Sequence, residues 1–177
     1  MKSEPLHHVW EFTDLDREFW QEHLETWLPR RIFDAHTHVS EPQFRLEEMT
    51  DQKRRQYWAN EVAEPIGAEA AAKCHDRVLP GRELSCLVFG HPSRDYDVRA
   101  ANTRLQEDCA ARGWYMLACI GPDWPLDEVG RLLEMQRVLG VKVYYAMIPG
   151  QDPNTRDSHL EASIFDFLPH AQLELLN

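Results

Sequence analysis

The sequence predicts an α/β fold built on a parallel sheet, and two observations support this prediction. Residues 83–90, 114–121 and 141–148 are apolar along almost their whole length instead of alternating between apolar and polar side chains. Strands that are buried on both faces have this composition, and parallel sheets are their usual setting. These segments also alternate with stretches that carry apolar residues at helical spacing, which is the order of repeated strand–helix units.

Residues 1–30 are expected to form a helical extension that precedes this unit. Apolar and aromatic residues recur at helical spacing over residues 19–27, with Asp14 or Asp16 as the expected N-cap. Pro29 ends this helix, because its ring blocks further helical hydrogen bonding.

Residues 31–177 are expected to form one α/β unit that begins with a strand at 31–39. Two of its helices end at a glycine, Gly113 and Gly140, where a left-handed residue closes a helix. In chain order, the expected helical segments are 46–62, 97–113, 125–140 and 165–176.

Four strands can be counted in this way. A complete (β/α)₈ barrel needs about 250 residues, and the chain has 177. The strand–helix units therefore predict either an open four-stranded sheet or the first four units of such a barrel.

Composition restricts the possible partners. The 19 basic and 30 acidic residues give a formal net charge of −11, and so acidic a chain repels the phosphates of a nucleic acid. No apolar stretch approaches the roughly 18 residues of a membrane span, so no membrane partner is expected. The four cysteines form no CxxC pair, which predicts free thiols in the reducing cytoplasm.

Residues 32–39, Ile-Phe-Asp-Ala-His-Thr-His-Val, carry the pattern that indicates chemistry. Side chains alternate along a strand, so Asp34, His36 and His38 are expected on one face. Two imidazoles at this spacing can reach a single ion, and neutral histidine suits zinc, iron or nickel. Asp34 would then accept a ring N–H or brace the adjoining loop. The alternative interpretation is a pair of exposed histidines that only water or backbone satisfies.

This segment resembles the first strand of the metal-dependent amidohydrolase superfamily, in particular its amidohydrolase-related branch, which includes decarboxylases. Asn102, then WYMLACIGPDW and GVKVYY, follow in the order of that branch's second to fourth strand–helix units. The resemblance covers about residues 31–177. It implies the front half of a (β/α)₈ barrel, with the chain ending before the fifth strand.

The resemblance implies that His36 and His38 hold a divalent metal, zinc first, with manganese, iron or nickel as alternatives. It also implies a hydrolase that uses metal-activated water on amide, ester or lactone bonds of a small molecule, or a related decarboxylase. In the family, residues of the fifth, sixth and eighth strands complete the site. Those positions would follow Asn177, so no catalytic residue is assigned in this chain.

Lys142 and His91 are further candidates at the same end of the sheet. The resemblance offers a carboxylated metal ligand at Lys142. The residue type also allows a cation that binds a substrate carboxylate, or a structural lysine paired with an acid such as Asp34. His91 follows the second apolar segment and can contact substrate or occupy a turn.

Two other functions fit the same residues. One is a half-barrel that is not an enzyme and is either inert or associates with other copies. Its exposed sheet edges favour self-association, so a homo-oligomer is expected. The other is a different His-x-His metallohydrolase, such as a phosphoesterase or a deoxyribonuclease-like barrel.

Overall fold

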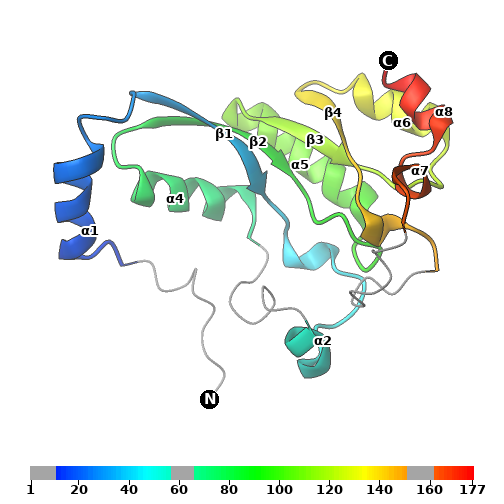
Figure 1. Ribbon diagram of the computed structural model, residues 1–177, viewed down its shortest axis with the longest axis horizontal. Helices are drawn as coiled ribbons and strands as arrows, with labels where there is room; N and C mark the ends of the chain where they lie inside the picture. The colour runs from blue at the N-terminus through cyan, green and yellow to red at the C-terminus, as the bar shows by residue number, and fades with distance from the viewer. Residues whose placement is uncertain (1–10, 57–65, 151–161) are drawn as a thin grey trace.

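A computed structural model describes residues 11–56, 66–150 and 162–177. Its centre is one four-stranded sheet in the order β1-β2-β3-β4, with every neighbouring pair parallel (Figure 1). The predicted α/β class with a parallel sheet is therefore confirmed. The strands are β1 Arg31–His38, β2 Glu83–Phe89, β3 Tyr115–Cys119 and β4 Val138–Lys142.

The connections between strands are helical, and shorter helices precede and follow the sheet (Figure 1). Within the described ranges, no helix is both long enough and apolar enough to cross a membrane. The helices are α1 Asp14–Phe19, the π-helical turn η2 Trp20–Leu24, the 3₁₀ turn η3 Pro42–Phe44, α2 Asp51–Gln56, α4 Ala68–Val78, α5 Val98–Arg112, α6 Leu126–Leu133, the 3₁₀ turn η4 Tyr145–Met147, α7 Ile164–Phe167 and α8 His170–Leu175.

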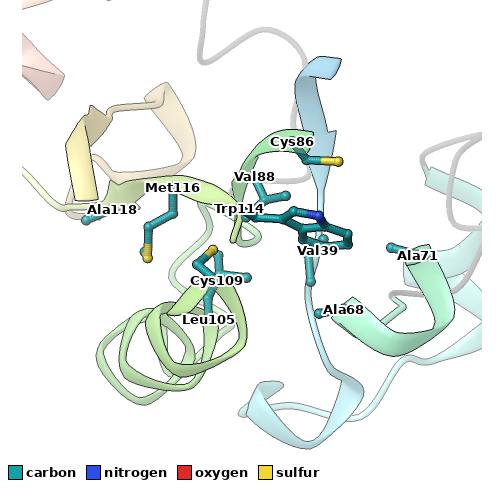
Figure 2. Packing of buried hydrophobic residues seen from close by; sticks show 10 residues of the cluster. All are labelled: Val39, Ala68, Ala71, Cys86, Val88, Leu105, Cys109, Trp114, Met116 and Ala118. Atoms are coloured by element: carbon teal, nitrogen blue, oxygen red, sulfur yellow. The ribbon is translucent and has the colours of Figure 1, made fainter. Parts of the chain in front are cut away.

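The strand order determines which face the helices cover. Parallel crossovers are right-handed, so strands that are neighbours both in sequence and in the sheet place all their crossover helices on the same face. The core agrees, because α4, α5 and α6 all contribute to one cluster beneath the sheet, including Ala71, Leu105 and Leu132. Figure 2 shows Leu105 and Cys109 of α5 beneath Val88 and Met116 of the sheet, and Ala68 and Ala71 of α4 beside Val39 and Trp114.

The opposite face of the sheet is called the open face below. Register places Phe33 of β1, Phe89 of β2 and Lys142 of β4 on it, because their neighbours in the strands point toward the helices. Phe33 is 53% exposed, whereas Phe89 at the carboxyl end of β2 is only 1% exposed. The open face is therefore exposed to solvent near the amino end of β1 and buried at the carboxyl end of β2.

Helix α5 forms where the sequence predicts it. The Asp97 side chain accepts a hydrogen bond from the backbone N–H of Ala100, which caps the first turn. Gly113 ends the helix with φ 72°, a left-handed conformation that costs a residue with a Cβ more than it costs glycine.

The predicted glycine cap at residue 140 is wrong. Helix α6 ends at Leu133, and Gly140 lies inside β4 opposite Leu117. The strand also ends earlier than predicted, at Lys142, because its partner Cys119 is the last residue of β3. None of the described strands other than β3 pairs with β4, and beyond Lys142 the chain forms a 3₁₀ turn over Tyr145–Met147 instead of continuing as a strand.

Three other predicted helix limits are corrected. Thr13, rather than Asp14 or Asp16, is the N-cap of α1, and the Asp16 side chain completes a capping box by accepting the Thr13 N–H. The predicted last helix is split into α7 and α8, with Pro169 as the N-cap of α8. Within the predicted helix 46–62, α2 begins only at Asp51, and residues 57–65 lie outside the described part.

Candidate metal site at the carboxyl end of the sheet

His36 and His38 lie side by side at the end of β1. His38 is opposite Phe89 in the parallel register, and both imidazoles are exposed. Their ring centroids are 5.4 Å apart with an angle of 57° between the planes. The first strand therefore presents the histidine pair at the edge where the carboxyl ends of the parallel strands meet, which is where α/β folds gather their ligands.

Phe89 is the platform on which this pair is arranged. Its ring centroid is 4.8 Å from that of His36 and 4.4 Å from that of His38, and both contacts are edge-to-face. The Lys142 ammonium lies over the same ring, with Nζ 4.5 Å from its centroid. The two imidazoles and the ammonium of the predicted site thus all contact one buried aromatic ring. The edge-to-face contacts suit the imidazole rings, and the position over the ring face suits the ammonium cation.

Asp34 is not on the face predicted for it. β1 pairs Asp34 with Cys86 but Thr37 with Val88, so it holds one residue more than β2 over this stretch. Such a bulge interrupts strict alternation. Cys86 and Val88 point into the core beneath the sheet, and Asp34 and Thr37 share their side. The histidines lie on the open face, and the simple two-residue period fails between them and Asp34.

The Asp34 carboxylate braces the bulge from the helix side. Its Oδ1 accepts the backbone N–H of His36 at 2.9 Å, and its Oδ2 is 3.9 Å from Nε2 of His75 on α4. The other ring nitrogen of His75 is 3.7 Å from the Cys86 Sγ. Asp34 therefore positions the backbone that carries His36, while the imidazole it meets belongs to His75.

The surroundings of His38 favour its neutral form. Desolvation, followed by the positive charges of His36, His91 and Lys142, lowers the pKa of His38 to about 4. Burial also lowers the pKa of His91. Only a neutral imidazole has a free lone pair for a metal, so His38 is ready to act as a ligand at neutral pH.

His91 lies near enough to influence His38 but is held by other groups. Its ring centroid is 4.5 Å from that of Tyr96, and the Tyr96 hydroxyl accepts a hydrogen bond from Arg45 Nη2 at 2.7 Å. This packing on a buried tyrosine fits the turn role that was one of the two predicted for His91.

Arg94 ties the loops together at the same edge. Its Nε donates to the Met147 carbonyl at 2.7 Å, and its Nη2 donates to the Asp123 carboxylate at 2.6 Å. Asp123 precedes α6 but does not cap it, because Pro125 is the N-cap of that helix. The loops after β2, β3 and β4 are therefore linked through this one guanidinium.

The histidine pair fits two ligands of one metal ion. With Zn–N bonds of about 2.1 Å and a tetrahedral angle, two bound imidazoles have ring centres about 5 Å apart, close to the 5.4 Å observed. Over residues 11–56, 66–150 and 162–177, however, no three side chains of His, Cys, Asp or Glu come close enough to hold an ion together. Within the described residues, at most two such side chains can therefore share an ion.

Sequence reasoning missed Phe89 and His75. Phe89 was treated as a core residue of an apolar strand, although its place as the last residue of β2 indicates that it lies beside the end of β1. The role of His75 depends on the packing of α4 against β1, for which the sequence carries no local signal.

Comparisons with known proteins do not place the chain in a family. No protein-family model, no curated protein and no solved structure matches it.

Proposed function

We propose that the chain provides the metal-binding part of a hydrolase, or of a related decarboxylase, of the amidohydrolase type. The observation that carries this proposal is the spacing of His36 and His38, which fits two ligands of one tetrahedral ion at the carboxyl end of a parallel sheet. When bound, a divalent metal would polarise a substrate carbonyl or carboxylate and lower the pKa of a coordinated water.

Each residue around Phe89 has a separate role in this proposal. His36 and His38 hold the ion through ring nitrogens. Asp34 keeps the bulge in place through the His36 N–H. Phe89 fixes the orientation of both imidazoles and excludes water beneath them, since it is almost completely buried.

Lys142 is proposed to bind a carboxylate of the substrate. Asp34, one possible partner for a structural lysine, lies on the other side of the sheet. The ammonium contacts the Phe89 ring, and none of the described carboxylates lies within ion-pair distance of it. A half-buried cation next to the histidine pair therefore favours a small anionic substrate.

The test is metal content, measured by plasma mass spectrometry after incubation with zinc or manganese and desalting. We expect wild-type protein to retain metal and the double variant His36→Ala/His38→Ala to lose it. The variant His23→Ala/His170→Ala removes two other exposed histidines and serves as the matched control. Equal metal content in wild type and the His36/His38 variant would refute the proposal.

A second function is favoured by a different observation, namely the exposed apolar side chains at the sheet edges, Phe33 and Leu139. They favour a module that associates through these edges, with or without catalysis. Activity assays separate the classes. Turnover of amide, lactone or carboxylate substrates supports the proposed enzyme, turnover of phosphodiesters alone supports another metallohydrolase, and association without turnover supports the module.

A further inference from the structure

The proposed site does not explain the two edges of the sheet. Among the described strands, β1 and β4 each have a neighbour on one side only. Unpaired edges expose backbone donors and acceptors and invite pairing with another chain. Neither Arg31–His38 nor Val138–Lys142 contains a proline that would block such pairing.

Large apolar side chains are exposed along the same edges. Phe33 on β1 is 53% exposed and Leu139 on β4 is 61% exposed. Tyr144, just after β4, is also exposed. The helices that follow in the chain, α7 and α8, expose four more large apolar side chains: Ile164, Phe165, Leu173 and Leu175. A stable interface of standard size buries about 800 Å² per partner, and pairing both edges would bury Phe33 and Leu139 in it.

The charge pattern permits two copies to meet on this side. The chain carries a net charge of −11, which opposes association in general. From Phe33 toward the carboxyl end, however, the strand positions on the open face are apolar, aromatic, small or basic, and none is Asp or Glu. Along this part of the open face, two copies therefore bring no carboxylates together, and Glu83, nearer the amino end of β2, is already paired with Arg30.

We propose that two copies of the chain close one eight-stranded parallel barrel. A two-fold rotation about an axis along the strands preserves their direction, so β4 of each copy runs parallel to β1 of the other. Four strands from each copy give eight, the number at which parallel strands close a barrel filled with side chains. One rotation pairs all four free edges and leaves none exposed, as a closed two-fold assembly requires.

This assembly also completes the metal site, and in this respect the inference rests on the proposed function. The second copy's β1 takes the place of a fifth strand, opposite the first. The interior of an eight-stranded barrel is only wide enough for side chains to fill it. His36 and His38 of the two copies therefore face each other, and the second copy supplies the donors that the described residues of one copy lack.

The experiment measures mass and zinc content on the same sample of the full chain, by light scattering after size exclusion and by plasma mass spectrometry. The variant Phe33→Lys/Leu139→Lys places a charge on each edge, and Leu15→Lys, at a 74% exposed position on α1, is the matched control. We expect wild type and Leu15→Lys to be dimers that retain zinc. The edge variant should be a folded monomer by circular dichroism, with a zinc Kd about 100-fold higher because donors are lost.

The outcomes separate this inference from the proposed function. A wild-type monomer, a larger oligomer, or an edge-variant monomer that binds zinc as tightly as wild type overturns the shared barrel and leaves the proposed metal site intact. A dimer whose zinc content is unchanged in His36→Ala/His38→Ala, or that binds no zinc, overturns both. If the edge variant unfolds, the monomer is instead obtained by diluting the wild-type protein, and its zinc affinity is measured at each concentration. Zinc affinity must then fall at the concentration where the dimer dissociates.

Discussion

The side chain of Asn102 links helix α5 to the end of strand β3, and its removal has a predictable cost. The residue is 2% exposed. Its Nδ2 donates to the Cys119 carbonyl at 2.7 Å, and its Oδ1 accepts the Cys119 N–H at 3.0 Å. Asn102→Ala leaves both buried backbone groups without these partners. Each orphaned group costs about 1–3 kcal/mol, so we expect the free energy of unfolding to fall by roughly 2–6 kcal/mol.

Urea unfolding followed by tryptophan fluorescence measures this loss, and thermal unfolding should show a Tm lower by about 4–24 °C. Thr103→Ala is the control, because Thr103 is exposed on the same helix and its hydroxyl only back-bonds to the Arg99 carbonyl at 3.2 Å. The control should stay within about 0.5 kcal/mol of wild type. If Asn102→Ala also stays within that range, the bidentate amide contact does not hold β3 in place.

Two further predictions concern helix glycines and the pH dependence of stability. Gly130→Ala in α6 should raise the free energy of unfolding by about 0.5–1 kcal/mol, since a Cβ there meets nothing within 4 Å. Gly113→Ala should lower the free energy of unfolding by about 1 kcal/mol, because φ at this residue is +72°. Urea unfolding in which Gly113→Ala is the more stable of the two variants would contradict the conformations described. The unfolded chain protonates His38 near pH 6.5, but native His38 stays neutral until about pH 4. The unfolded state therefore binds more protons between these values, and stability falls as pH drops from about 6.5 to 4. His38→Gln should make this fall shallower, and an unchanged slope would show that His38 is not responsible.

The parallel sheet could be predicted from the sequence because its signal is local. Residues 83–90 and 114–121 are apolar on both strand faces, and the glycine at 113 marks the end of the helix between them. The same local reasoning failed at residues 143–148. Their composition favours a strand, but a strand needs a neighbour, and β3 ends opposite Lys142.

The candidate site was predictable in part. The spacing of His36 and His38 survives in the structure because His36 lies within the bulge and His38 follows it, with both side chains on the open face. Asp34 precedes the bulge and is turned to the helix side. A bulge arises from the pairing of two strands that lie far apart in the sequence, so alternation along one strand cannot reveal it.

The most direct test of the central claim is an anomalous difference map at the zinc absorption edge, from a crystal of the full chain grown with zinc. We predict a strong peak bonded to a ring nitrogen of His36 and a ring nitrogen of His38 at about 2.1 Å. A map with no peak beside these imidazoles, or with zinc bound only elsewhere, would contradict a metal site at the end of β1.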